Sequence, residues 1–184
     1  MAAPDLRTVR AVFLDRDGTI NVKAAEGEYI RTTDELVLLP GAAAALATLN
    51  AAGLRTVLVT NQRWLSEKDA DPAHFALIQR RLGELLAREG ARLDAAYHCP
   101  HAADSCECRK PLAGMLVRAA REHGFGLAES VMVGDSDIDM MAGRAAGAAT
   151  ILLRPGGRAC GDVDFVVDDL AAAADLILNA QAVH

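Results

Sequence analysis

Two carboxylates follow an apolar stretch near the start of the chain, where residues 12–19 read VFLDRDGT. The apolar residues before Asp15 predict a short strand that is buried on both faces. Carboxylates at the end of a buried strand are costly unless a cation or a chemical reaction compensates them. A carboxylate is ionised at neutral pH and can act as a nucleophile without a separate base. We therefore interpret Asp15 and Asp17 as candidate catalytic residues.

Polar residues also stand at the ends of two other predicted strands. Thr60 closes one of them and Asn61 follows it, whereas Asp135 comes directly after another. In open parallel sheets, ligands bind beyond the carboxyl ends of the strands. We therefore expect these side chains to converge with Asp15.

The convergence of these groups would suit the transfer of a phosphoryl group. A magnesium ion held by Asp15 and Asp135 would offset the repulsion between a carboxylate and a phosphate dianion. Lys110 would add a fixed positive charge, and Thr60 would donate its hydroxyl to a phosphoryl oxygen. Asp17 would protonate the leaving oxygen and later activate water.

A second cluster contains three of the four cysteines and has the spacing of a metal site rather than of a disulfide framework. Cys99, His101, Cys106 and Cys108 form a Cys₃His set, which is typical of structural, tetrahedral zinc. His98 competes with His101 as the histidine ligand, and we favour His101 because His98 belongs to the preceding strand. The alternative is a loop of unliganded cysteines.

The predicted zinc loop, residues 99–108, is followed at once by two cations, Arg109 and Lys110. Bound zinc would fix the backbone that directs both cations at the phosphate. Without the metal we expect a disordered loop and an inactive protein.

Apolar periodicity alternates between strands and helices along the whole chain. Strands are expected at 12–14, 56–60, 95–97, 130–133, 150–153 and 164–167, and helices at 42–52, 74–89, 111–123, 137–146 and 170–179. Residues 21–39 and 63–72 are expected to be loops, too short for a large cap. Alternating units of this kind favour a parallel sheet with helices on both faces. The predicted fold is thus α/β, with a single Rossmann-like domain over 1–184 and a zinc-binding loop.

Composition narrows the class of protein. The 184 residues carry a net charge of −6, which argues against a nucleic-acid partner. No apolar run is long enough for a membrane span, and the N-terminus does not resemble a signal peptide. We expect a cytoplasmic monomer that acts on a small phosphorylated substrate, in which Cys160 has no role.

The catalytic candidates occur in an order that resembles the four motifs of the haloacid dehalogenase superfamily of phosphatases. The matching segments are Asp15-Arg-Asp-Gly-Thr19, Thr60-Asn61-Gln62, Arg109-Lys110-Pro111 and Gly134-Asp135-x-x-x-Asp139. The resemblance implies that Asp15 is the phosphorylated nucleophile and Asp17 the general acid/base. It implies that Thr60 and Lys110 bind phosphate. The magnesium site that it implies comprises Asp15, Asp17, Asp135 and Asp139, the last as a ligand or an outer partner.

The zinc loop resembles that of a capless branch of this superfamily. Cys-Pro-His followed by Cys-x-Cys-Arg-Lys-Pro is similar to the D-glycero-D-manno-heptose 1,7-bisphosphate phosphatases and the histidinol-phosphate phosphatases. The resemblance implies hydrolysis of a sugar phosphate, foremost heptose 1,7-bisphosphate at its 7-phosphate. Histidinol phosphate or another sugar phosphate is the alternative substrate, and a non-catalytic zinc-knuckle binding module is the remoter alternative.

Some positions depart from that branch and bear on the substrate. Ser136 stands where the relatives tend to have a lysine or arginine, and Arg63 or Arg109 would replace that charge. Trp64, close to the predicted site, would either stack on a sugar ring or pack within its loop. The residues expected to contact substrate are Glu26, Tyr29, Asn61, Gln62, Arg63, Arg109 and Ser136.

Overall fold

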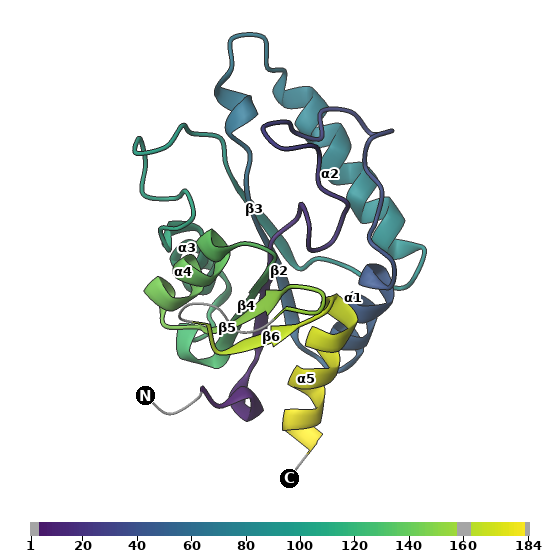
Figure 1. Ribbon diagram of the computed structural model, residues 1–184, viewed down its shortest axis with the longest axis vertical. Coiled ribbons are helices and arrows are strands. Elements are labelled where there is room, and N and C mark those ends of the chain that lie inside the picture. The colour runs from purple at the N-terminus through teal and green to yellow at the C-terminus, as the bar shows by residue number, and fades with distance from the viewer. Residues whose placement is uncertain (1–3, 158–162, 183–184) are drawn as a thin grey trace.

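The protein is built on one six-stranded sheet, seen in the computed structural model (Figure 1). The structure describes residues 4–157 and 163–182, so Cys160 lies outside the described residues. Every neighbouring pair of strands is parallel, in the order β3-β2-β1-β4-β5-β6. The strands are β1 (Ala11–Leu14), β2 (Arg55–Asn61), β3 (Ala95–Cys99), β4 (Ser130–Gly134), β5 (Ala149–Leu153) and β6 (Phe165–Val167). The predicted α/β class is confirmed.

Helices cover both faces of this sheet (Figure 1). The α-helices are α1 (Ala42–Ala51), α2 (Pro72–Ala87), α3 (Gly114–His123), α4 (Asp137–Ala146) and α5 (Leu170–Ala182). Short 3₁₀ helices occupy Leu6–Thr8, Arg63–Ser66 and Leu127–Glu129. Side chains of α1, α2 and α5 share one hydrophobic cluster with the sheet, and those of α3 and α4 share the other. In Figure 1, α3 and α4 lie on the left of the sheet, and α1 and α5 lie on the right.

Strand β1 lies in the middle of the sheet and is buried along its whole length. Side chains alternate across a strand, so Val12 and Leu14 enter the cluster of α1, α2 and α5, whereas Phe13 enters the cluster of α3 and α4. The Phe13 ring lies 5.7 Å from that of Phe125, just after α3. The predicted strand, buried on both faces, is confirmed.

The register of the sheet brings the ends of three strands to one edge. Leu14, the last residue of β1, pairs with Leu58 of β2 and with Val133 of β4. The Asp15 amide then donates to the Val133 carbonyl at 3.0 Å, which carries the ladder one residue further. Residues that follow β1 and β4, and those that close β2, therefore meet at the carboxyl edge.

Two local predictions were wrong. The helix expected from Pro111 begins at Gly114, because residues 109–112 form a turn in which the Leu112 amide donates to the Arg109 carbonyl at 2.8 Å. The Lys110 amide donates to Asn61 Oδ1 at 3.1 Å, and Asn61 Nδ2 donates to the Lys110 carbonyl at 2.9 Å. The loop expected over residues 63–72 contains the 3₁₀ helix Arg63–Ser66, and α2 begins at Pro72, behind the capping side chain of Asp71.

The connection between β1 and α1 is long but contains no strand or α-helix in the described part of the chain. Isolated bridges join Asn21 to Asp17 and to Leu38, so the segment folds back on itself beside the carboxyl edge. This agrees with the expected absence of a large cap at this connection. Among the described residues, no helix combines the length and the apolar character that crossing a membrane requires.

Candidate active site

A cavity of about 300 Å³ opens at the carboxyl edge of the sheet. Its lining comes from the loop after β1, the end of β2, Lys110 and the start of α4. Residues whose side chains carry polar groups there are Asp15, Asp17, Lys23, Glu26, Glu28, Tyr29, Thr60, Asn61, Lys110, Asp135, Ser136 and Asp139. Ten of the residues expected from sequence therefore line one cavity: Asp15, Asp17, Glu26, Tyr29, Thr60, Asn61, Lys110, Asp135, Ser136 and Asp139.

Lys110 is almost fully buried and lies between two carboxylates. Its Nζ is 2.6 Å from Asp15 Oδ1 and 2.6 Å from Asp139 Oδ1, and it donates to the Val59 carbonyl at 2.8 Å. Burial alone would lower the pKa of Lys110, but the Asp139 and Asp15 carboxylates outweigh it and raise this pKa above its ordinary value. Lys110 is therefore a permanent cation in this site.

Burial also acts on the Asp15 carboxyl. It raises the pKa of Asp15 to about 7, against the opposing attraction of the Lys110 ammonium. The neighbouring Asp139 and Asp17 carboxylates add to the rise because they repel a further negative charge. An additional cation beside Asp15 would restore the ionised form that a nucleophile requires.

Asp15, Asp135 and Asp139 each place one carboxylate oxygen within 4.8 Å of the others. Magnesium prefers oxygen ligands of this kind, and three carboxylates with a single buried lysine leave negative charge for the ion to offset. The donor set therefore fits Mg²⁺. Lys23, which lies in the loop after β1, pairs with Asp135 Oδ2 at 2.7 Å.

Gly18 makes room for the carboxylate of Asp135. Its φ is +90°, and a Cβ at this position would clash with Asp135 Oδ2. Any larger residue would be strained and would also displace the carboxylate. The DxDG pattern at the end of β1 thus contributes a glycine for spatial as well as conformational reasons.

The Asp17 carboxylate lies apart from the group of three acids and is held by three donors. Arg16, whose side chain is completely buried, approaches Asp17 Oδ2 at 3.0 Å through Nη2. Gln62 Nε2 donates to the same oxygen at 2.9 Å, and Asn21 Nδ2 donates to Oδ1 at 2.9 Å. Asp17 therefore has a fixed orientation at the rim of the cavity.

Ser136 is the N-cap of α4 and fixes Asp139 rather than standing free. Its amide and its hydroxyl both donate to Asp139 Oδ2. In return the Ser136 side chain accepts from the Asp139 backbone amide, and the two contacts form a capping box. The other oxygen of Asp139 is left for Lys110.

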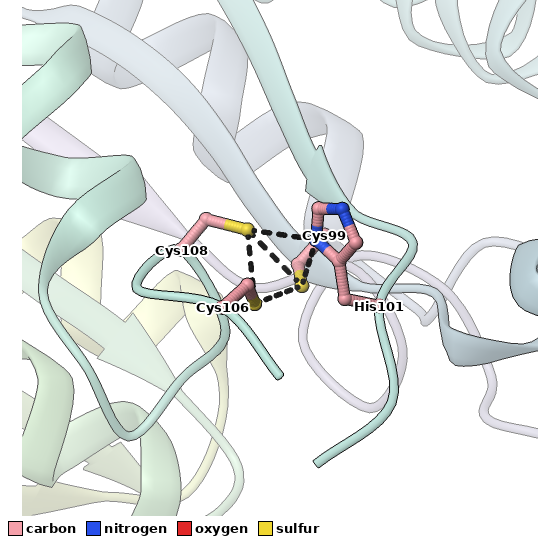
Figure 2. Close-up of side chains that lie close together, drawn as sticks. All are labelled: Cys99, His101, Cys106 and Cys108. Carbon is pink, nitrogen blue, oxygen red and sulfur yellow. Dashed lines mark hydrogen bonds between the residues drawn. The ribbon is translucent and has the colours of Figure 1, made fainter. Parts of the chain in front are cut away.

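The four predicted zinc ligands lie together, with their ligand atoms pointing at one another (Figure 2). The three sulfur atoms are 3.3–3.5 Å apart, and His101 Nδ1 lies 3.7 Å from the Cys99 sulfur and 3.3 Å from that of Cys108. Ligands placed tetrahedrally at zinc distances would be separated by about 3.5–3.8 Å. The cluster therefore fits a four-coordinate zinc ion. His98 is not one of the four and packs against Phe75 instead, with ring centroids 4.4 Å apart.

The zinc loop continues directly into Lys110. Arg109 Nη1 donates to the His101 carbonyl at 3.3 Å, which ties the end of the loop to its start. Asn61 then holds the Lys110 main chain through the two hydrogen bonds described above. The backbone that carries Lys110 is thereby joined to both the Cys/His cluster and the end of β2.

Three residues expected to contact substrate do not line the cavity. Arg63 is exposed on the 3₁₀ helix after β2, Arg109 faces the zinc loop, and Gln62 is buried behind Thr60 and Asp17. Conversely, Lys23 lines the cavity and was not predicted to do so. Its only sequence signal is that a lysine stands in the loop that follows β1 and Asp15.

Trp64 is 2% exposed and makes no contact with the cavity, so it packs within its segment. Its indole N–H donates to Gln62 Oε1 at 2.9 Å. Of the two alternatives predicted for this residue, stacking on a ligand ring is disfavoured by its burial.

Comparison with known proteins adds to this geometry. Residues 5–147 match the family described as haloacid dehalogenase-like hydrolase. The chain is 35% identical over 175 residues to a protein of Pseudomonas aeruginosa named D-glycero-beta-D-manno-heptose-1,7-bisphosphate 7-phosphatase, with 91% of this chain and 97% of that protein covered. A protein of Bordetella bronchiseptica with the same name is 38% identical over 179 residues, covering 93% and 99%.

Two solved structures of phosphatases are also similar to this chain. The crystal structure of D,D-heptose 1,7-bisphosphate phosphatase from B. bronchiseptica, complexed with magnesium and phosphate, superposes with a TM-score of 0.84 at 35% identity, covering 93% of this chain and 99% of that one. A putative HAD-like phosphatase from Mesorhizobium loti gives a TM-score of 0.77 at 35% identity, covering 95% and 87%.

Proposed function

The chain belongs to the haloacid dehalogenase-like hydrolase family, and from this premise we propose that it is a magnesium-dependent phosphomonoesterase whose substrate is D-glycero-D-manno-heptose 1,7-bisphosphate. The observation that carries the proposal is the Asp15 carboxylate, which faces the cavity with Lys110 at 2.6 Å and two further acids beside it. This arrangement combines a nucleophile with a cation and a metal-binding group.

Asp15 is the proposed nucleophile. The Lys110 ammonium holds Oδ1, so the carboxylate has one oxygen in a fixed ion pair, and its other oxygen is the one that attacks phosphorus. The new Asp15–phosphorus bond forms as the bond from phosphorus to the sugar oxygen breaks. Water then attacks the phosphorylated Asp15, which releases inorganic phosphate and restores the carboxylate.

Asp17 is the proposed general acid and base. It would protonate the departing sugar oxygen in the first step and accept a proton from the attacking water in the second. The contacts from Arg16, Gln62 and Asn21 keep its carboxylate oriented throughout. The hydroxyl of Thr60, which lines the cavity, would donate to a phosphoryl oxygen.

The carboxylates of Asp15, Asp135 and Asp139 would hold Mg²⁺, which when bound offsets the negative charge of the phosphate and polarises the phosphoryl group. Lys23 would exchange its pairing with Asp135 for a pairing with substrate once that charge is offset. Ser136 already orients the Asp139 carboxylate, so this side chain would lose little conformational entropy when the ion binds.

Zinc is the ion that the Cys99, His101, Cys106 and Cys108 cluster would hold. With four protein ligands the ion has no open position, so its role would be structural. It would fix the segment before Lys110, and so keep the Lys110 main chain in place for its two hydrogen bonds with Asn61.

The second phosphate of a bisphosphate needs a cation that is not already neutralised. Among the described residues lining the cavity, the two cations are Lys110 and Lys23. Lys110 is committed to Asp15 and Asp139, whereas the Lys23 side chain is 59% exposed and able to turn. We assign the distal phosphate to Lys23, and the sugar to the part of the cavity lined by Glu26, Tyr29 and Ser136.

The test is phosphate release from heptose 1,7-bisphosphate by the wild-type protein and by Asp15→Asn, with Mg²⁺ present. We expect at least a thousandfold loss of kcat in the variant, because the amide is not a nucleophile. Unchanged turnover in the variant would rule out an aspartyl-phosphate intermediate. Melting curves of both proteins serve as the control for folding.

A panel of phosphate esters identifies the substrate. Heptose 1,7-bisphosphate should give the highest kcat/KM, ahead of histidinol phosphate and simple sugar phosphates. A preference for histidinol phosphate would support the alternative enzyme, and no phosphate release from any of them would favour a zinc-binding module without catalysis. The proposal places the enzyme in the cytoplasm as a monomer.

A further inference from the structure

Trp64 lies behind the cavity rather than in it, and it ends a chain of hydrogen bonds that reaches two groups of the proposed reaction. Its indole N–H donates to Gln62 Oε1 at 2.9 Å. The amide of Gln62 then donates to Asp17 Oδ2 at 2.9 Å and to Thr60 Oγ1 at 2.8 Å. Gln62 itself is completely buried.

The orientation of the Gln62 amide follows from the chemistry of its neighbours. An indole N–H is only a donor, so the atom of Gln62 that faces Trp64 must be the oxygen. Arg16 Nη2, also only a donor, approaches the same oxygen at 3.3 Å. Nε2 therefore faces Asp17 and Thr60, and its two hydrogens match the two acceptors.

This orientation has a consequence for the hydroxyl of Thr60. Because Thr60 Oγ1 accepts from Gln62, its own hydrogen must point elsewhere, and no acceptor for it is found among the described residues. Thr60 lines the cavity, so that hydrogen is available to a ligand there. The same amide also holds the Asp17 carboxylate.

We propose that Trp64 is a positioning residue for the reaction: through its indole N–H it holds the Gln62 amide, which directs the Thr60 hydroxyl and the Asp17 carboxylate toward the cavity. The inference rests on the proposed phosphatase function and adds to it the residue that organises its donor and its acid. Arg16 favours the same amide orientation, so loss of the indole N–H would loosen the amide rather than reverse it.

A purely structural role is the competing explanation, because Trp64 also fills space. Its ring lies edge-on to Phe75, with centroids 6.4 Å apart, and the Arg31 guanidinium lies 5.5 Å from the ring centroid. A core role depends on the ring, whereas a positioning role depends on the N–H. Substitutions that separate the ring from the N–H therefore distinguish the two.

The first experiment measures kcat and KM for Trp64→Phe, which keeps an aromatic ring and removes the N–H. We expect kcat to fall about tenfold, the factor for one well-placed hydrogen bond, with KM changed less than twofold. Phe75→Leu is the matched control, since it disturbs the same aromatic pair and leaves the N–H bond intact. It should lower Tm as Trp64→Phe does, with kcat unchanged.

Equal losses of kcat in Trp64→Phe and Phe75→Leu would overturn the proposal, as would no loss in Trp64→Phe. A wild-type protein that releases no phosphate would instead count against the proposed function. The two failures are thus separable.

A double-mutant cycle tests whether Trp64 acts through Gln62. Gln62→Met removes the amide and keeps the length of the side chain. In that background, Trp64→Phe should cause no further loss of kcat. Independent, multiplicative losses would overturn the proposed relay.

A measurement on the wild-type chain covers the case in which Trp64→Phe does not fold. Trp64 is the only tryptophan, so a single indole ¹H–¹⁵N resonance reports its hydrogen bond. We expect this resonance to move when inorganic phosphate and Mg²⁺ are added to the wild-type protein, and to stay in place in Thr60→Val. A resonance that does not respond in the wild type would overturn the proposal.

Discussion

Lys110 and Lys23 line the same cavity but differ in how far their charges are already neutralised. Lys110 is 2% exposed and lies between Asp15 and Asp139, so its charge is already paired with two carboxylates. Lys23 pairs with Asp135, and the Lys23 side chain is 59% exposed. An exposed pair contributes little to stability. Lys23 is therefore the cation that a substrate can recruit at low cost.

Replacing Lys23 by Met should raise KM for heptose 1,7-bisphosphate about tenfold, because a charge-assisted hydrogen bond to the distal phosphate is lost. The KM for heptose 7-phosphate, which has no distal phosphate, should stay within twofold of the wild type. Steady-state kinetics on both substrates check this. Lys68→Met, on an exposed residue outside the cavity, is the control. Equal effects of Lys23→Met on both substrates would contradict the assignment.

At the scale of elements, the zinc loop and the end of β2 act together on one lysine. The loop leads directly into Lys110, and Asn61 binds the Lys110 main chain on both its amide and its carbonyl. On a flexible loop, Lys110 would be beside Asp15 in only a small fraction of molecules. Fixing the loop for the reaction would then cost conformational entropy. The proposed zinc ion thus contributes to the reaction by ordering this segment.

Removing zinc with a selective chelator, while Mg²⁺ is kept in excess, should abolish phosphate release, and added zinc should restore it. Cys106→Ser should bind zinc weakly and lose activity in the same way. Glu107→Ala, an exposed neighbour outside the ligand set, should keep both zinc and activity. Metal content and kcat are measured on the same samples. Full activity after verified loss of zinc would refute the link between the loop and Lys110.

The turn after β1 permits a paired test of conformation against space. Gly18 and Gly53 have φ values of +90° and +80°, but a Cβ would clash with Asp135 only at Gly18. Gly53→Ala should cost about 1–2 kcal/mol of unfolding free energy from backbone strain and leave kcat unchanged. Gly18→Ala should cost more and weaken Mg²⁺ binding, because it displaces a proposed ligand. Urea unfolding and Mg²⁺ titration measure the two effects, and equal costs with unaltered Mg²⁺ binding would contradict this account.

At the scale of the whole molecule, β1 contributes side chains to both hydrophobic clusters and leads directly into Asp15, the proposed nucleophile. All four of its residues are buried, with neighbouring strands on both sides and helices above and below. A side chain attached directly to the end of this strand has little positional freedom. The buried residues of β1 therefore both stabilise the fold and fix the position of Asp15.

Phe13→Ala should lower the unfolding free energy by about 3–5 kcal/mol, because it leaves a cavity in the cluster of α3 and α4. Val117→Ala, on the outer face of α3 and 48% exposed, should change it by no more than about 0.5 kcal/mol. Denaturant titrations of both variants give the comparison. A small effect at Phe13 would show that the two clusters repack independently of β1.

Sequence patterns predicted the site residues at the ends of strands. They missed Lys23, whose long side chain enters the cavity from a loop. Asp15, Thr60 and Asp135 were found because parallel strands bring their carboxyl ends to one edge. Lys23 lies in a loop without periodicity, and its approach to Asp135 depends on bridges between Asn21, Asp17 and Leu38 that no local pattern encodes. The start of α3 was also missed, since the chain forms a turn between Arg109 and Leu112 before the helix begins at Gly114.

The two candidate metal clusters differ in the separation of their ligands along the chain. The Cys/His ligands fall within residues 99–108, whereas the three carboxylates come from residue 15 and from residues 135–139 and meet only when β1 pairs with β4. The entropic cost of closing a loop grows with its length. During synthesis on a ribosome, the thiol cluster is complete before Asp135 has been added to the chain. The proposed zinc ion would therefore be able to bind a chain that is still being synthesised, whereas the proposed magnesium ion would bind only after β1 has paired with β4.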